Sequence, residues 1–153
     1  MTGESPTTAR DVDAAIASVE GELSTLFTRV RAMMRSYAER VHPELTAAGY
    51  KTLSALERRG PVSSGALAEL LETDKSTLSR QITALDRLGL LSRSPDPADG
   101  RSTILSVTPE TAERLREIRS SDQAQLHEEL RSWGDGEVEQ LGRLLHRINA
   151  LES

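Results

Sequence analysis

The chain has 153 residues and a formal net charge of −5, with 19 basic and 24 acidic side chains. Its length fits one domain, or one compact module with extensions. It contains no cysteine, which excludes disulfides and thiolate metal sites. Its apolar runs are too short to span a membrane, which takes roughly 20 residues. The polar N-terminus lacks the apolar core of a signal peptide, so a cytoplasmic protein is expected.

The negative net charge of the chain argues against a nucleic-acid partner, but the charge is unevenly distributed along the sequence. Residues 44–108 carry eight basic and eight acidic side chains, whereas residues 109–153 carry six and ten. A protein that is acidic overall can still present a locally basic face. The balanced middle of the chain is therefore where such a face is expected.

The first predicted helix covers residues 11–41 and follows a polar segment, 1–10, that is expected to be disordered. At 1.5 Å per residue this helix would be about 46 Å long, too long for a small core to cover. Residues 11–43 are therefore expected to pair with a partner helix, and Pro43 ends the helix. Apolar residues at steps of three and four form its single stripe: Val12, Ile16, Val19, Leu23, Leu26 or Phe27, Val30, Met34, Tyr37 and Val41.

Three shorter helices are predicted next. One runs from Glu44 to Arg58, with Leu45, Ala48, Leu53 and Leu56 facing inward. Ser63 is expected to cap the N-terminus of a helix over 64–71, and Thr73 is expected to cap the N-terminus of a helix over 74–88. Gly89 is expected to end the helix 74–88. A short helix, a tight turn and a longer amphipathic helix predict a helix-turn-helix.

A β-hairpin is predicted after this motif. Leu88 to Leu91 leads into it and Ser102 to Thr108 leads out, around a tip rich in proline, glycine and aspartate. Thr108-Pro109-Glu110 is typical of the start of a helix. Residues 133–136 are typical of a turn, and the apolar spacing from Val138 to Leu151 predicts a last helix. The expected fold is mainly α with a small β-hairpin.

The polar face of the helix 74–88 suggests contact with double-stranded DNA. Small hydroxyls allow a helix to lie close to base edges, arginine can bind guanine, and glutamine can pair with adenine. An ordinary solvated helix face is the alternative, but the position just before a charged hairpin favours DNA. The candidate residues are Lys75, Ser76, Thr77, Ser79, Arg80, Gln81 and Thr83.

The hairpin supplies three further candidates. Asp99 lies two residues before Arg101 and can hold its guanidinium by a charge-assisted hydrogen bond. A fixed guanidinium favours a narrow A·T minor groove. Arg93, at the base of the hairpin, suits a phosphate. The alternative is that Asp99 and Arg101 only stabilise a turn.

Several short motifs occur together between residues 44 and 112: Leu67-Ala68-Glu69, Ser76 to Arg80, Leu85 to Arg93, Asp99-Gly100-Arg101 and Leu105 to Thr108. Together they resemble the multiple-antibiotic-resistance regulator (MarR) family. The resemblance implies a homodimeric winged helix-turn-helix repressor, with Ser76, Thr77, Ser79, Arg80 and Gln81 at the major groove and Arg101, oriented by Asp99, in the minor groove. It divides the chain into a tail (1–10), a dimerisation helix (11–43), a DNA-binding lobe (44–108) and C-terminal dimerisation helices (109–153).

In many members of that family a small phenolic or other aromatic acid binds between the dimer helices and the DNA-binding lobe. The resemblance therefore implies a small-molecule effector. The candidate lining residues are Tyr37, Arg40, His42 and Tyr50. Each also has a structural alternative, the tyrosines as the edge of the core and His42 as a loop residue.

Enzymatic and metal-dependent functions find little support. The three histidines, His42, His127 and His146, are scattered, and neither a phosphate-binding glycine loop nor a nucleophile elbow is present. No cofactor is expected. The main alternative to a DNA-binding repressor is a helical interaction module that docks on a protein partner.

Overall fold

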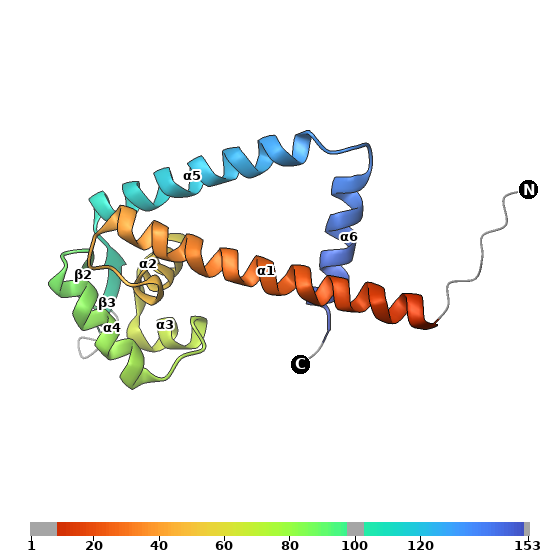
Figure 1. Ribbon diagram of the computed structural model, residues 1–153. Coiled ribbons are helices and arrows are strands. Elements are labelled where there is room, and N and C mark those ends of the chain that lie inside the picture. Colours follow the sequence, from red (N-terminus) through yellow and green to blue (C-terminus); the bar gives the residue numbers. More distant parts are fainter. Residues whose placement is uncertain (1–8, 98–102, 152–153) are drawn as a thin grey trace, which may run out of the picture. The chain divides into compact units, whose positions relative to one another are not determined.

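The computed structural model describes residues 9–97 and 103–151. Two compact units divide the chain, one ending at Ala112 and the other beginning at Glu113. The predicted fold class is confirmed: the described residues are mostly helical, with a small antiparallel sheet (Figure 1). In chain order the elements are α1 (Ala9–Val41), α2 (Ala47–Arg59), β1 (Val62–Ser63), α3 (Ser64–Leu70), α4 (Lys75–Arg87), β2 (Leu91–Pro95), β3 (Thr103–Val107), α5 (Pro109–Arg131) and α6 (Glu137–Asn149).

Helix α1 is the long helix that the apolar stripe predicts, and it begins two residues earlier, at Ala9. Its C-terminal end is buried through Tyr37, Ala38 and Val41, and this end packs against α2. Figure 1 shows the rest of α1 extending away from α2, α3 and α4. Its apolar side chains there stay 46–59% exposed: Val12, Ile16, Val19, Leu26 and Phe27.

Helix α2 begins three residues later than predicted. Residues 42–45 form a turn in which the Leu45 amide donates to the His42 carbonyl over 2.9 Å. The Thr46 hydroxyl then caps α2 by accepting from the Gly49 amide at 3.0 Å. Ala48, which was predicted to face inward, lies exposed in the first turn, and Thr52 takes the buried position instead.

The helix-turn-helix is confirmed in α3 and α4. Ser63 caps α3 as predicted, accepting from the Ala66 amide at 3.3 Å. Gly89 follows α4 with a φ of +68°, the left-handed conformation expected of it. The predicted cap of α4 is wrong: the Thr73 amide completes the α3 turn by donating to the Ala68 carbonyl, and Asp74 is the N-cap.

The sheet has the strand order β1-β3-β2 and is antiparallel throughout. β2 and β3 pair from Leu91 with Val107 to Pro95 with Thr103, so the predicted hairpin is present. The strand predicted from Leu88 begins only at Leu91, because Leu88 is the C-cap of α4. β1 was not predicted, since two residues carry no readable pattern. The tip residues Asp99 and Arg101 lie outside the described residues.

The unit that begins at Glu113 contains most of α5 and all of α6. The turn predicted at 133–136 is present, and Gly136 enters α6 with a φ of +81°. Across the described ranges, no helix is long and apolar enough to cross a membrane. Four large apolar residues of α6 are 39–44% exposed: Val138, Leu144, Leu145 and Ile148.

The first prediction concerns the core that holds α4. Leu78 is 1% exposed, so replacing it with alanine leaves a cavity and should lower the free energy of unfolding by about 2–5 kcal/mol. Leu70, in the neighbouring helix, is 50% exposed, and Leu70→Ala should cost less than about 1 kcal/mol. Urea unfolding of both variants checks this, and equal losses would contradict the assigned burial.

The second prediction concerns the Asp74 cap. The Ser76 hydroxyl and the Thr77 hydroxyl and amide hydrogen-bond this carboxylate, which holds its pKa far below the ordinary 3.8. Because the pKa of Asp74 is lower in the folded protein than in the unfolded chain, the charged carboxylate stabilises the fold at pH values above about 3.8. This stabilisation is lost as the pH falls from there toward the pKa of the folded state. Asp74→Asn should therefore lower the Tm at neutral pH, and its deficit should shrink below about pH 4. A deficit that stays constant in thermal unfolding from about pH 7 to 3 would contradict the charged cap.

Candidate nucleic-acid interface

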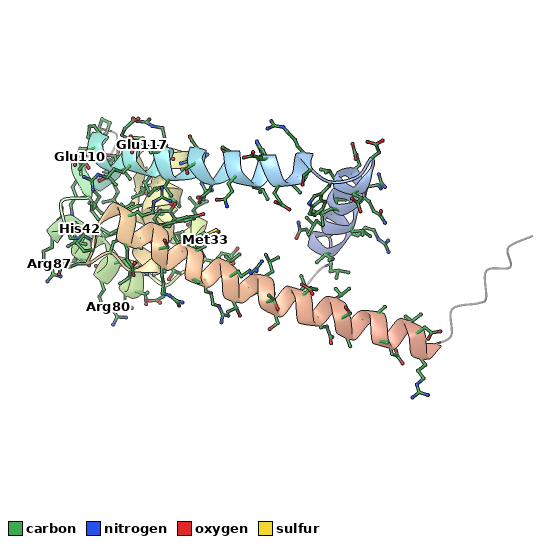
Figure 2. All side chains as sticks on the ribbon, turned by 45° about the horizontal axis from the view of Figure 1, so that its top comes forward. Met33, His42, Arg80, Arg87, Glu110 and Glu117 are labelled. Atoms are coloured by element: carbon green, nitrogen blue, oxygen red, sulfur yellow. The ribbon has the colours of Figure 1, made fainter. Side chains whose placement is uncertain are left out.

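Helix α4 has one buried face and one exposed face. Leu78, Ile82 and Leu85 are 1–4% exposed and anchor the helix. Arg80 and Arg87 extend outward from it (Figure 2). The structure therefore brings the candidate side chains of α4 together on one accessible side. Lys75, Ser76, Ser79, Arg80 and Thr83 are exposed there, and Thr77 and Gln81 are half-buried.

The N-terminus of α4 is already occupied by a negative charge. The Asp74 carboxylate accepts from the Thr77 amide at 2.8 Å and from the Ser76 hydroxyl at 2.5 Å. The Arg80 guanidinium donates in turn to the Thr77 hydroxyl at 3.4 Å. An anionic cap offsets the attraction of a helix N-terminus for phosphate. At the N-terminal end of α4, the exposed side chain of Lys75 is the candidate for a phosphate contact.

Gln81 is held by a residue that the sequence analysis did not identify. Its side-chain oxygen lies 2.9 Å from the Thr52 hydroxyl of α2, which also lies 3.1 Å from the Ala48 carbonyl oxygen. A hydroxyl has one proton, so Thr52 donates to one of these oxygens at a time. Thr52 is 1% exposed, and this bond ties the side chain of Gln81, a candidate DNA contact, to the core. A buried threonine in a helix pattern gives no sequence signal of such a partner.

Arg93 of β2 contacts α4 directly. Its Nε donates to the Asp86 carboxylate at 3.0 Å, and the two side chains are 41% and 46% exposed. Such a solvent-exposed pair adds little stability. It does fix where the guanidinium sits, beside the C-terminal half of α4. Asp86 is a second residue that the sequence analysis left out.

A concavity of about 290 Å³ joins α4 to the sheet and to the start of α3. It brings together three residues that were predicted separately as DNA contacts, Lys75, Ser79 and Arg93. Its remaining lining is Ser64, Gly65, Leu78, Ile82, Thr103 and Leu105. Asp99 and Arg101, the other predicted contacts of the hairpin, fall outside the described residues.

The candidate effector residues lie near the junction of α1 and α2. The rings of Tyr37 and Tyr50 are 5.6 Å apart between centroids and tilted by 49°, and both are mostly buried. The Arg40 guanidinium carbon lies 5.8 Å from the centroid of the Tyr37 ring. His42 is engaged in the turn, where its Nδ1 accepts from the Glu44 amide at 3.1 Å. The structure therefore groups the two tyrosines with Arg40.

Known proteins share this architecture. The MarR family profile matches residues 45–103. The uncharacterized HTH-type transcriptional regulator YxaD of Bacillus subtilis is 33% identical over 131 residues, which cover 86% of this chain and 90% of the relative.

Two solved structures have the same fold at low identity. A mutant MarR of E. coli, complexed with operator DNA, is 24% identical, covers 84% of this chain and 91% of that one, and has a TM-score of 0.60. Streptococcus pneumoniae FabT in complex with DNA is 15% identical, covers 88% and 94%, and has a TM-score of 0.79. The match to the family profile and the match to YxaD show that the chain belongs to the MarR family of helix-turn-helix transcriptional regulators.

Proposed function

We propose that this protein is a dimeric repressor that binds a pseudo-palindromic DNA operator through α4 and is released by a small aromatic or phenolic ligand. The observation that carries the proposal is the polar face of α4, exposed to solvent while Leu78, Ile82 and Leu85 fix its opposite face. The operator complex of the E. coli relative and the DNA complex of FabT support the same role for this chain.

In this proposal α4 enters the major groove. The hydroxyls of Ser76, Thr77, Ser79 and Thr83 are short, so the helix can approach base edges closely. Arg80 reaches beyond them and suits the O6 and N7 acceptors of guanine. Gln81 contacts a base while Thr52 holds its side chain from behind.

Phosphate contacts fall to the cations beside α4. Lys75 and Arg93 lie at the same concavity, one on the helix and the other on the sheet. The charged Asp74 makes the helix N-terminus itself a poor phosphate site. Arg101 is assigned to the adjacent minor groove, with Asp99 as its orienting partner; this assignment rests on the sequence motif.

The exposed apolar residues of α1 and α6 support a homodimer. Large apolar side chains at helical spacing, half exposed on a single chain, are what a symmetric partner would bury. We assign residues 11–43 and 109–153 to dimerisation and residues 44–108 to the DNA-binding lobe. A dimer of this kind places its two recognition helices about 34 Å apart, in successive major grooves.

The grouping of Tyr37, Tyr50 and Arg40 supports the ligand-release part of the proposal. Two aromatic rings beside a guanidinium match the two halves of an aromatic acid, a flat apolar body and an anionic group. These rings lie where α1, assigned to dimerisation, meets α2 of the DNA-binding lobe. A ligand inserted there would change how the lobe is held.

The third prediction tests DNA recognition. After an operator has been selected from random duplexes, Arg80→Ala should weaken binding by roughly five- to 150-fold, since a bidentate base contact is worth about 1–3 kcal/mol. Arg116→Ala, which removes an exposed pair with Glu113 elsewhere, is the matched control and should bind like the wild type. Fluorescence anisotropy at several salt concentrations provides the affinities.

Arg101→Ala tests the hairpin in the same assay and should lower both the affinity and the preference for A·T flanks. A wild-type protein that shows no saturable duplex binding even at low salt would contradict the proposed function and favour the protein-interaction module.

A further inference from the structure

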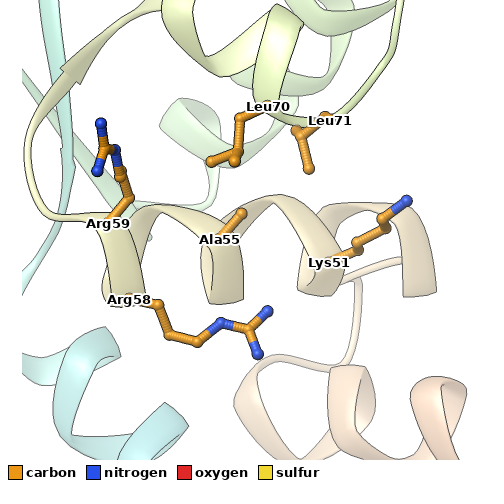
Figure 3. Close-up of a pocket in the computed structure, with 6 residues that line it drawn as sticks. All are labelled: Lys51, Ala55, Arg58, Arg59, Leu70 and Leu71. Carbon is orange, nitrogen blue, oxygen red and sulfur yellow. The ribbon is translucent and has the colours of Figure 1, made fainter. Parts of the chain in front are cut away.

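Helix α2 is packed on several sides, and this packing fixes where its buried threonine lies. The helix contacts α1, α4 and β3, and another side faces the end of α3, where Leu70 and Leu71 lie above Ala55 (Figure 3). Leu53 is fully buried, and Thr52 beside it is 1% exposed. Because close-packed side chains have little freedom to move, the Thr52 hydroxyl is a fixed point next to α4.

The Thr52 hydroxyl has two oxygens within reach and one proton to donate. The Ala48 carbonyl oxygen, 3.1 Å away, lies inside α2, where the backbone amide four residues further on is its ordinary partner. The Gln81 side-chain oxygen, 2.9 Å away, has no other hydrogen bond within residues 9–97 and 103–151. Donation to Gln81 therefore gives both oxygens a donor, whereas donation to Ala48 would leave the Gln81 oxygen facing another oxygen.

This hydrogen bond orients the whole amide of Gln81. The oxygen and the NH2 group diverge from the same carbon, so an oxygen held by Thr52 turns the NH2 group away from the hydroxyl. Gln81 is half-buried, and together with Arg80 it lines a concavity of about 260 Å³ between the start of α2 and α4. The NH2 group is thus the half of the amide that is available to a partner of α4.

A glutamine that uses only its NH2 group reads bases differently from one whose amide is unrestrained. The usual pairing of glutamine with adenine needs both halves of the amide, because adenine presents N6–H2 as a donor and N7 as an acceptor. Guanine instead presents two acceptors, O6 and N7, and the NH2 group has two protons to donate. Cytosine presents only a donor. An amide restricted to donation therefore favours guanine.

We propose that Thr52 is a positioning residue that sets which base Gln81 reads. By holding the Gln81 oxygen, it makes guanine, rather than adenine, the preferred base at the operator position that Gln81 contacts. Thr52 itself touches no base. This inference rests on the proposed function, in which Gln81 faces a base in the major groove.

The fourth prediction compares base preferences at one operator position by competition between duplexes that differ only there. The position is the one at which Gln81→Ala loses its preference. In the wild type, guanine should be preferred over adenine on the same strand by at least about fivefold, the lower bound for a bidentate base contact. Thr52→Val keeps the branched shape but releases the amide, so the preference should move toward adenine by at least about this factor.

Three further variants isolate the contribution of the hydroxyl. Thr52→Ser keeps it and should retain the preference for guanine. Gln81→Glu keeps an oxygen for Thr52 but replaces the NH2 group with a second oxygen, so it should favour cytosine on that strand. Thr111→Val is the matched control: it removes another buried threonine hydroxyl, 2.8 Å from that of Thr108, and should keep the wild-type preference. Thermal unfolding by circular dichroism verifies that every variant is folded.

The orientation of the amide is measured separately, on DNA-free protein, by NMR of the Gln81 side chain. With the oxygen against Thr52, the NH2 protons should give only weak nuclear Overhauser effects to the Thr52 side chain. Strong effects would place the NH2 group, not the oxygen, against the hydroxyl.

Four results would overturn the inference alone, in a protein that still binds its operator. They are strong nuclear Overhauser effects between the NH2 protons and Thr52, a wild-type preference for adenine or cytosine, an unchanged preference in folded Thr52→Val, and no position at which Gln81→Ala loses its preference. If the wild type binds no operator, the proposed function fails and the reading of guanine fails with it. The NMR result then still decides whether Thr52 holds the amide.

Discussion

Burial of Leu78, Ile82 and Leu85 is the constraint on which the rest of the interface depends. These side chains hold α4 against α3, α2 and β2, and their spacing leaves the opposite face of the helix to polar residues. The same packing sets the position of Gln81 beside Thr52 and of Asp86 beside Arg93. The exposed polar face of α4, proposed to read DNA, is therefore positioned by the apolar side chains on its opposite, buried face.

The carboxylates around α4 moderate its charge. Asp74 neutralises the N-terminal end, Asp86 pairs with Arg93, and the chain as a whole is acidic. Non-specific affinity for DNA comes mainly from phosphate neutralisation, so this arrangement keeps that component small. In the proposed repressor, specific binding would then rely more on base contacts by Arg80 and its neighbours.

The sequence predicted the elements with strong periodicity and missed interactions between elements. The stripe of α1, the helix-turn-helix, the Ser63 cap and the Gly89 stop all follow from local patterns. The choice of Asp74 over Thr73 as a cap depends on the turn that follows α3, and the Thr52–Gln81 contact joins residues 29 positions apart. Both arise only from the packed fold. The contact between the rings of Tyr37 and Tyr50 also arises only in the packed fold, and the part of these residues in ligand binding stays a prediction.

The most direct test of the account is hydroxyl-radical footprinting of the selected operator, because it reports which faces of the duplex the protein covers. Two recognition helices placed by a symmetric dimer should protect two patches on one face of the duplex, about one helical turn apart and related by the operator's pseudo-symmetry. Methylation of guanine N7 within both patches should interfere with binding. A single protected patch, or binding insensitive to major-groove methylation, would contradict the central claim that paired α4 helices read the operator.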